Sequence, residues 1–347
     1  MAAGWQGRGA RMAVVVTGAG GFVGLAVTEA LLQAGDAVTA LDSAPLPAAA
    51  HALFATLPGT LRTVTGDARD PATVQAALAG ADRMVVMAAV TAGPAREAAD
   101  PEGIIGVNVG AVATAIRLAA AAGLRRVVHV SSVAAYGALP DTPGPLTEDM
   151  PCHPTGLYGV TKLAGEGVAL RLADLAGLDL VAARLGSCFG PWEHATGLRD
   201  TLSPQWQVLD ALRRDQPVVL ETDAVRDWIY VRDAAAGLLA LLDTPGLPHR
   251  IYNVGSGTTW PLSEWCEALA PGRPWQVGPA PHVRTWNMRP QTSIARLLAD
   301  TTFRPCFGAS EAAADWLAFL DRAGLGSLAP RGANEALSAP SSSGVKA

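Results

Sequence analysis

Short apolar runs alternate with stretches of helical composition through the first half of the chain. The first run, residues 12–16, is too short for a helix and rich in β-branched residues, so it predicts a buried strand. By the same pattern we expect further strands at 36–41, 61–67, 83–89 and 126–132, and helices at 25–32, 71–78, 102–122 and from 158 onward. This alternation predicts an α/β fold with a Rossmann-type, doubly wound parallel sheet.

The two ends of the chain lack this pattern. Residues 1–11 are rich in Gly, Ala and Arg, and we expect them to form a flexible extension. Residues 324–347 are rich in Gly, Ser, Ala and Pro and have too few apolar side chains to pack, which predicts a disordered tail.

A glycine-rich turn joins the first predicted strand to the first predicted helix. Its glycines at 18, 21 and 24 permit a tight turn, close approach of a pyrophosphate, and close packing of helix on strand. The N-terminus of the helix offers free N–H groups and the positive end of a dipole to phosphates. The turn therefore predicts a dinucleotide site, and the expected cofactor contacts are Gly18, Gly20, Gly21, Phe22, Val23 and Gly24.

Asp42 follows the second predicted strand, about 20 residues after the glycines, where a carboxylate can bind the hydroxyls of an adenosine ribose. No Arg or Lys follows it until Arg62, so nothing local can pair with a 2′-phosphate, which favours NAD over NADP. The alternative is a turn residue before Ser43 and Pro45.

Two further strand ends lie where such a cofactor would bind. Asp67 follows the third predicted strand and could accept from an adenine amino group, with a plain loop aspartate as the alternative. The fourth strand ends in the small residues Ala88 and Ala89, which leave room for a cofactor at the carboxyl edge of the sheet.

Tyr158 and Lys162 are four residues apart and therefore share one face of a helix. A phenol with a pKa near 10 is a poor base, but a nearby ammonium stabilises the phenolate and lowers that pKa. Such a tyrosine can take the proton of a secondary alcohol during hydride transfer, while a serine from the Ser131-Ser132 strand end orients the oxygen. The alternative is a helix N-terminus with a surface lysine.

Composition excludes several other classes. The chain has 347 residues, 50% hydrophobic and 16% charged, which suits a substantial core in one large domain or two lobes. Its net charge is −5 with no basic block, which argues against nucleic acid as a partner. No stretch approaches the roughly 18 apolar residues of a membrane span, so we expect an unexported, cytoplasmic protein without a membrane partner.

The metal-binding residue types are scattered. The four cysteines form no Cys-x-x-Cys pair, which argues against a zinc site or a disulfide scaffold and fits a reducing cytoplasm. The six histidines form no helical pair with a nearby acid, so we predict no metal.

Taken together, these motifs resemble the extended short-chain dehydrogenases/reductases of the NAD-dependent epimerase/dehydratase family. The resemblance covers residues 12 to about 323, with the motifs in family order. Beyond the residues above, it rests on Tyr136-Gly137, Arg184, Phe189-Gly190-Pro191, the run from Arg226 to Asp233, and the run from Tyr252 to Gly257.

The resemblance implies a role for each catalytic residue. Ser132 rather than Ser131 is the catalytic serine, because it lies four residues before the Tyr-Gly pair, and Ser131 is a candidate substrate contact. Tyr158 is the acid/base, and Lys162 binds the nicotinamide ribose while tuning Tyr158. Asn108 resembles the helix asparagine behind the catalytic group, a structural or proton-relay residue of the cofactor site.

The resemblance also implies an NAD-binding domain at 12–185, and at 186–323 mainly a smaller α/β substrate lobe with segments returning to the main sheet. Within this lobe Arg226 matches a position that often binds a diphosphate, and Arg289 is a second such candidate. Ser187 stands where nucleotide-sugar members usually carry Asn, which weakens but does not exclude a UDP-sugar; Gln291–Arg296 departs from the usual Asp-Thr-Ser-Lys pattern as well.

Eight of the nine tryptophans lie after residue 190. Trp192, Trp206 and Trp286 are candidate neighbours of a sugar, with core or lid packing as the alternative. His194 and Arg199 could bind a carboxylate or phosphate near the pocket mouth, or belong to a solvated loop.

We therefore expect an enzyme that uses NAD to oxidise a secondary hydroxyl of a sugar or sugar acid to a ketone. The close alternative is a UDP-sugar 4-epimerase with tightly bound NAD, which uses the same half-reaction. A non-catalytic NAD-binding sensor is a remote alternative, because such relatives usually lose the Tyr or the Lys. By analogy, the helices at 102–122 and 155–175 are expected to form a homodimer interface.

Overall fold

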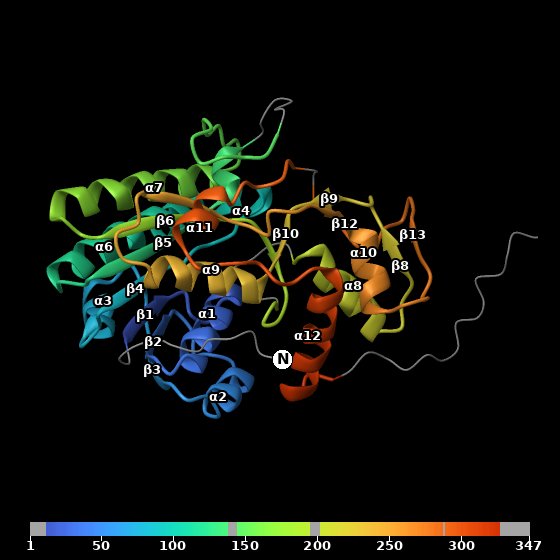
Figure 1. Cartoon of the computed structure of the whole chain (residues 1–347), viewed down its shortest axis with the longest axis horizontal. Helices are drawn as coiled ribbons and strands as arrows, with labels where there is room; N and C mark the ends of the chain where they lie inside the picture. Colours follow the sequence, from blue (N-terminus) through green and yellow to red (C-terminus); the bar gives the residue numbers. More distant parts are fainter. Residues whose placement is uncertain (1–11, 138–143, 195–201, 287–288, 327–347) are drawn as a thin grey trace, which may run out of the picture.

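A seven-stranded parallel sheet forms the centre of the larger part of the molecule, on the left in Figure 1. This computed structural model describes residues 12–137, 144–194, 202–286 and 289–326; the predicted extension and most of the predicted tail lie outside them. The strand order is β11-β6-β5-β4-β1-β2-β3, and every neighbouring pair is parallel. The strands are β1 Ala13–Thr17, β2 Ala37–Asp42, β3 Thr60–Thr65, β4 Arg83–Val86, β5 Arg126–Ser132, β6 Leu180–Leu185 and β11 Ile251–Val254. The doubly wound fold expected from the sequence is confirmed.

Helices cover both faces of this sheet (Figure 1). One face carries α3 (Pro71–Leu78), α6 (Val112–Ala121) and α7 (Leu157–Ala176), and the other carries α1 (Phe22–Gln33) and α9 (Val231–Asp243). Successive residues of a strand point to opposite faces, so Val15 packs in the core under α3, α6 and α7, whereas Val14 and Val16 pack in the core under α1 and α9.

Strand β4 is shorter than the predicted run to Ala89. After Val86 the N–H groups of Met87 and Ala88 donate to Thr17 Oγ1, at 3.0 and 3.3 Å, instead of to a neighbouring strand. A side-chain acceptor therefore ends the ladder and turns the chain away from the sheet at this edge.

The predicted helix over 102–122 is divided into α5 (Pro101–Ile105), the π-helical segment η1 (Gly106–Ala111) and α6. Asn108 lies in the π-helical segment and is buried, and such segments often occur at functional sites. The helical stretch Pro101–Ala121 is long and apolar enough to cross a membrane, but in this fold it packs against α7 over the sheet, with 39% of its most apolar window buried.

A smaller lobe lies on the right in Figure 1. Its short strands pair as β7 (Ser187–Phe189) with β10 (Trp228–Tyr230), β9 (Val225–Arg226) with β12 (Trp260–Pro261), and β8 (Val218–Leu220) with β13 (Trp275–Val277). Its helices are α8 (Pro204–Arg213), α10 (Leu262–Leu269) and α12 (Ala309–Arg322). Phe189 packs against the rings of Trp260, Trp265 and Trp316, so much of the tryptophan content builds this core.

The remaining short elements are α2 (Ala48–Phe54), α4 (Pro94–Ala99), η2 (Val133–Tyr136) and α11 (Ala295–Asp300).

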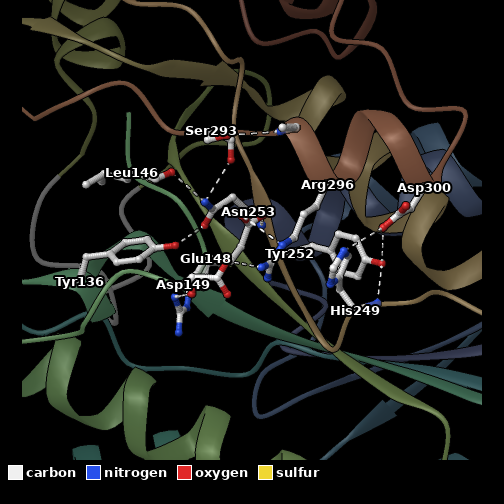
Figure 2. A network of polar contacts seen from close by, with 12 residues as sticks. Tyr136, Leu146, Glu148, Asp149, His249, Tyr252, Asn253, Ser293, Arg296 and Asp300 are labelled. Carbon is white, nitrogen blue, oxygen red and sulfur yellow. Dashed lines mark hydrogen bonds and ion pairs between the residues drawn. The ribbon is translucent and has the colours of Figure 1, made fainter. Parts of the chain in front are cut away.

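A polar network joins the end of β5 to the returning strand β11 (Figure 2). Tyr136 donates its hydroxyl proton to Asn253 Oδ1 at 2.7 Å, and the Asn253 backbone N–H donates to Glu148 Oε1 at 2.9 Å. The Asn253 amide nitrogen donates to the carbonyls of Leu146 and Ser293. This fully buried asparagine uses its side chain to hold together the three chain segments that carry Tyr136, Leu146 and Ser293.

Arg184 and Glu166 form a buried ion pair beneath this network. Two nitrogens of Arg184 on β6 donate to the carboxylate of Glu166 on α7, at 2.7 and 3.0 Å, and the side chains are only 5% and 3% exposed. A further Arg184 nitrogen donates to the Glu148 carbonyl, and the guanidinium lies 4.7 Å from the Tyr136 ring centre. Removing one partner would leave an uncompensated buried charge.

We expect Glu166→Gln to lower the free energy of unfolding by about 3 kcal/mol, the usual cost of breaking a buried pair. Urea denaturation at neutral pH measures this loss. The matched control is Asp174→Asn, which breaks the exposed pair with Arg250 and should cost less than about 1 kcal/mol. Equal losses in the two variants would contradict the predicted importance of the buried pair.

Candidate active site

A cleft of about 700 Å³ lies along the carboxyl edge of the parallel sheet. Ligands of doubly wound sheets bind at this edge, where the strand order reverses, here between β1 and β4. The cleft is lined by most of the predicted site residues, namely Gly18, Gly20, Gly21, Phe22, Val23, Gly24, Asp42, Asp67, Ala88, Ala89, Ser131, Ser132, Tyr158, Lys162, Ser187, Arg226 and Arg289. The fold therefore brings together residues from nine separate stretches of the chain.

The glycine turn is packed so closely against the protein backbone that a side chain would not fit at two of its positions. Gly18 has a φ of +70°, and a Cβ there would lie 2.7 Å from the Cα of Ala88. A Cβ at Gly24 would lie 2.1 Å from the Gly18 carbonyl oxygen, so this glycine lets α1 pack against the turn. Within the described residues no side-chain hydrogen bond caps α1 at Gly21, and the N-terminus of this helix points its positive dipole end toward the position where a phosphate is expected.

The two predicted acidic residues lie on the same rim of the cleft. Asp42 ends β2, and its Oδ2 accepts from the Gly20 N–H at 2.8 Å, so the carboxylate lies against the glycine turn. Asp67 forms an ion pair with Arg69 at 2.6 Å, and the Arg69 guanidinium holds the pKa of Asp67 below its ordinary value. Arg69 also lines the cleft and was missed by the sequence analysis. The only sequence signal for it was the spacing Asp-x-Arg in a loop.

Ser132, Tyr158 and Lys162 lie around one end of the cleft. Ser132 ends β5, and its Oγ accepts from the Ala134 N–H at 3.1 Å. Lys162 lies one turn after Tyr158 on α7, with Nζ 5.9 Å from the centre of the phenol ring, and donates to the Val130 carbonyl at 2.7 Å.

Burial lowers the pKa of Lys162 to about 8, although the nearby carboxylate of Glu166 acts in the opposite direction. At neutral pH the lysine therefore still carries its proton. Its positive charge is buried beside Tyr158, where it favours the phenolate form of the tyrosine.

Asn108 is part of the support for the site and does not line the cleft. Its side chain bonds both the N–H and the carbonyl of Val90, at 2.8 and 3.0 Å, and donates to Thr161 Oγ1 at 3.0 Å. Thr161 in turn donates to the Tyr158 carbonyl. Asn108 thus joins the cleft wall at Val90 to the helix turn that carries Tyr158.

Ser131 precedes the predicted catalytic serine and is 1% exposed. Its hydroxyl has no hydrogen-bond partner within the described part of the chain, yet the residue lines the cleft. A buried hydroxyl of this kind is costly unless a ligand pairs with it.

Two arginines, Arg226 and Arg289, also line the cleft. Arg226 donates to Ser187 Oγ at 3.1 Å, and its guanidinium lies 5.6 Å and 5.3 Å from the ring centres of Trp228 and Trp286. Burial, and then the charge of Arg289, lower the pKa of Arg226 to about 10. Burial also lowers the pKa of Arg289, which donates to the Val133 carbonyl at 2.9 Å. Two buried cations at one place favour an anionic ligand.

The predicted substrate tryptophans separate into two groups. Trp286 lines the cleft, as does His194, whereas Trp192 and Trp206 do not. Trp192 is buried and donates to Glu29 Oε2, because its ring is drawn into the core between α2 and α12. Arg199 lies outside the described residues. Within the described ranges, no group of three or more His, Cys, Asp or Glu side chains could hold a metal ion.

Comparisons with known proteins agree with this geometry. A profile of the NAD dependent epimerase/dehydratase family matches residues 14–255. The "Low-salt glycan biosynthesis protein Agl12" of Haloferax volcanii is 31% identical over 248 residues, which cover 71% of this chain and 77% of the relative. The UDP-glucose 4-epimerase of Corynebacterium glutamicum is 30% identical over 273 residues, covering 74% of this chain and 79% of the relative.

A similar solved structure is that of MoeE5 in complex with UDP-glucuronic acid and NAD. It superposes with a TM-score of 0.72 at 26% identity, and the match covers 89% of this chain and 99% of that chain.

The lowered pKa of Lys162 predicts a pH dependence of stability. The pKa is about 8 in the folded protein against an ordinary 10.5, so below about pH 8 the lysine is charged in both states and the full burial penalty is present. As the pH rises from about 8 to 10.5 this penalty disappears, and the free energy of unfolding should gain about 3 kcal/mol from this group. Urea denaturation of NAD-free protein at the two pH values measures the gain, and Lys162→Met should abolish it. An unchanged pH dependence in that variant would show that other groups are responsible.

Proposed function

This chain belongs to the NAD dependent epimerase/dehydratase family, and we propose that it oxidises a secondary hydroxyl of a sugar or sugar acid to a ketone. It is an enzyme of the extended short-chain dehydrogenase/reductase type, and its cofactor is NAD. The observation that carries the proposal is the grouping of Ser132, Tyr158 and the charged Lys162 around one end of a cleft that also contains the glycine turn.

The cofactor would be held by the residues that the cleft offers for each of its parts. The N-terminus of α1 would bind the phosphates, Asp42 the adenosine ribose, and Lys162 the nicotinamide ribose. Bound NAD supplies the hydride acceptor for the oxidation.

The protein residues handle the proton of the substrate hydroxyl. Tyr158, as the phenolate favoured by the Lys162 charge, accepts the hydroxyl proton, and the Ser132 hydroxyl orients the substrate oxygen. As the O–H bond breaks, the carbinol carbon loses its hydrogen as hydride and the carbonyl bond forms. Asn108 and Thr161 hold the backbone at Tyr158, which keeps the phenol at a fixed position.

Arg226 and Arg289 support an anionic substrate such as a sugar acid. Ser187 takes the place of the usual nucleotide-sugar asparagine and accepts from Arg226, so this position orients the guanidinium instead of supplying an amide to a nucleotide. This arrangement favours a small anionic sugar over a UDP-sugar. We also propose a homodimer through the helices at 102–122 and 155–175, which correspond to α5, η1 and α6 and to α7, and where Ile105, Val160 and Leu175 are exposed apolar side chains.

Replacing Tyr158 by Phe should lower kcat for NAD reduction by about 10²- to 10⁴-fold, because the proton acceptor is lost. The assay follows NADH absorbance with glucuronate, gluconate, glucose 6-phosphate and UDP-glucose. The affinity for NADH, measured by fluorescence, should remain near that of the wild type. Turnover that survives in Tyr158→Phe would refute the proposed role, and NAD that co-purifies without net reduction would instead indicate an epimerase.

Replacing Arg226 by Gln should raise KM for an anionic sugar by about 10- to 100-fold, because a charge-assisted hydrogen bond typically contributes about 1.5–3 kcal/mol. The change in kcat should be small, and steady-state kinetics separates the two effects. Arg284→Gln is the control, since Arg284 is an exposed arginine paired with Glu221 and does not line the cleft. A KM that does not respond to Arg226→Gln would mean that the anion binds elsewhere.

A further inference from the structure

Trp192 has a backbone conformation that is rare for a large side chain. Its φ of 71° lies in the left-handed region, although it is neither glycine nor asparagine. Such an outlier persists only where its surroundings hold it, and it is more common at functional sites. The local backbone here sends the Trp192 ring into the core, while His194, two residues later, reaches the cleft.

Three contacts hold the Trp192 ring. Its Nε1–H donates to Glu29 Oε2 at 2.7 Å. The ring packs edge-on against Phe54 on α2, with centres 5.5 Å apart, and against Phe319 on α12, with centres 4.8 Å apart. The indole is therefore fixed by α1, α2 and α12 together.

Glu29 is itself held by a chain of charged groups. Its Oε1 lies 3.1 Å from Arg232 Nη1, and Arg232 Nε donates to Asp315 Oδ2 at 2.5 Å. The same Asp315 oxygen accepts from the Tyr230 hydroxyl at 2.8 Å. This chain fixes the acceptor for Trp192 from α9 and α12.

The position of Trp192 determines the hydrogen-bonding character of His194. His194 Nδ1 lies 2.7 Å from the Trp192 carbonyl oxygen. A carbonyl can only accept, so Nδ1 must carry the proton, and in the neutral ring Nε2 is then an acceptor. Nε2 has no hydrogen-bond partner among the described residues, and His194 lines the cleft.

We propose that His194 Nε2 accepts a hydrogen bond from a hydroxyl of the substrate sugar, and that Trp192 and Glu29 are its positioning residues. The proposal rests on the sugar oxidation proposed above and names a substrate contact for it. Among the charged side chains of the described lining, Arg226 and Arg289 can only donate, and the carboxylates of Asp42 and Asp67 already accept from Gly20 and Arg69; the serine hydroxyls of the lining can donate or accept, whereas a neutral imidazole with its proton on Nδ1 can only accept at Nε2. A polyhydroxy ligand needs acceptors, and His194 provides one.

The test compares two substitutions that keep different nitrogen positions of the imidazole. His194→Asn keeps an N–H donor near the position of Nδ1 but has no acceptor near the position of Nε2. It should weaken glucuronate binding about 5- to 20-fold. His194→Gln places an amide oxygen near Nε2 and should recover most of the affinity. Trp192→Phe keeps an aromatic ring but loses the indole N–H that bonds Glu29. It should weaken glucuronate binding by a similar factor, with little further loss in the double variant with His194→Asn. His51→Asn, on the exposed surface of α2, is the control.

Two measurements are needed: KM and kcat in the active enzyme, and calorimetric binding of glucuronate to the NAD complex of Tyr158→Phe, in which turnover is blocked. We expect KM and the calorimetric Kd to rise together, with kcat and NADH affinity unchanged. The inference is overturned if His194→Asn leaves glucuronate affinity unchanged, if NADH affinity falls as much, if His194→Gln is no better than His194→Asn, or if the NAD complex does not bind glucuronate. Turnover that survives in Tyr158→Phe would refute the proposed function alone, because the effect of His194 on KM would still be measurable.

Discussion

The close approach of the glycine turn to the end of β4 is the constraint on which the rest of the site depends. A side chain at Gly18 would collide with the backbone of Ala88, so these two strand ends can lie together only as they do here. Thr17 completes the contact by accepting from two N–H groups just beyond β4. The N-terminus of α1 is consequently held over the carboxyl edge of the sheet, and Asp42 on the next strand meets the same turn.

Charge is distributed unevenly along the resulting cleft. Its carboxylates, Asp42 and Asp67, follow β2 and β3, and Asp67 is paired with Arg69, whereas Lys162, Arg226 and Arg289 come from other parts of the lining. The pKa of each of these three cations is lowered mainly by burial. Burying charged side chains costs free energy. A negatively charged ligand, or a reaction in which an oxygen becomes negative, would offset that cost. Both conditions would be met by the proposed oxidation of a sugar acid, in which the substrate is an anion and its hydroxyl oxygen loses a proton.

Local spacing explains which parts of the site could be predicted from the sequence. The glycine turn and the Tyr158–Lys162 pair depend on periodicity within one element, and the alternation of strands and helices gives the sheet edge where they meet. The position of Trp192 depends on Phe54, Phe319 and Glu29, which lie on three distant helices, so the sequence could not separate a sugar neighbour from a core residue. The π-helical turn at Asn108 could not be predicted from the sequence either, because it is accompanied by a contact between Asn108 and Val90, which lies 18 residues away.

Helix α1 connects the two halves of the cleft. Its first turn faces the expected phosphate site, and two turns later Glu29 holds the indole of Trp192, from which the chain continues to His194 at the substrate end. Because a helix transmits position rigidly over this distance, cofactor and substrate would be placed relative to the same element instead of through a flexible lobe boundary. Arg232 also links α12 to α1, because it forms ion pairs with Glu29 on α1 and with Asp315 on α12. These contacts hold the smaller lobe against the part of the molecule that contains the glycine turn. The spacing of cofactor and substrate is thereby fixed, and a change of about 1 Å in the distance between hydride donor and acceptor can lower the rate strongly.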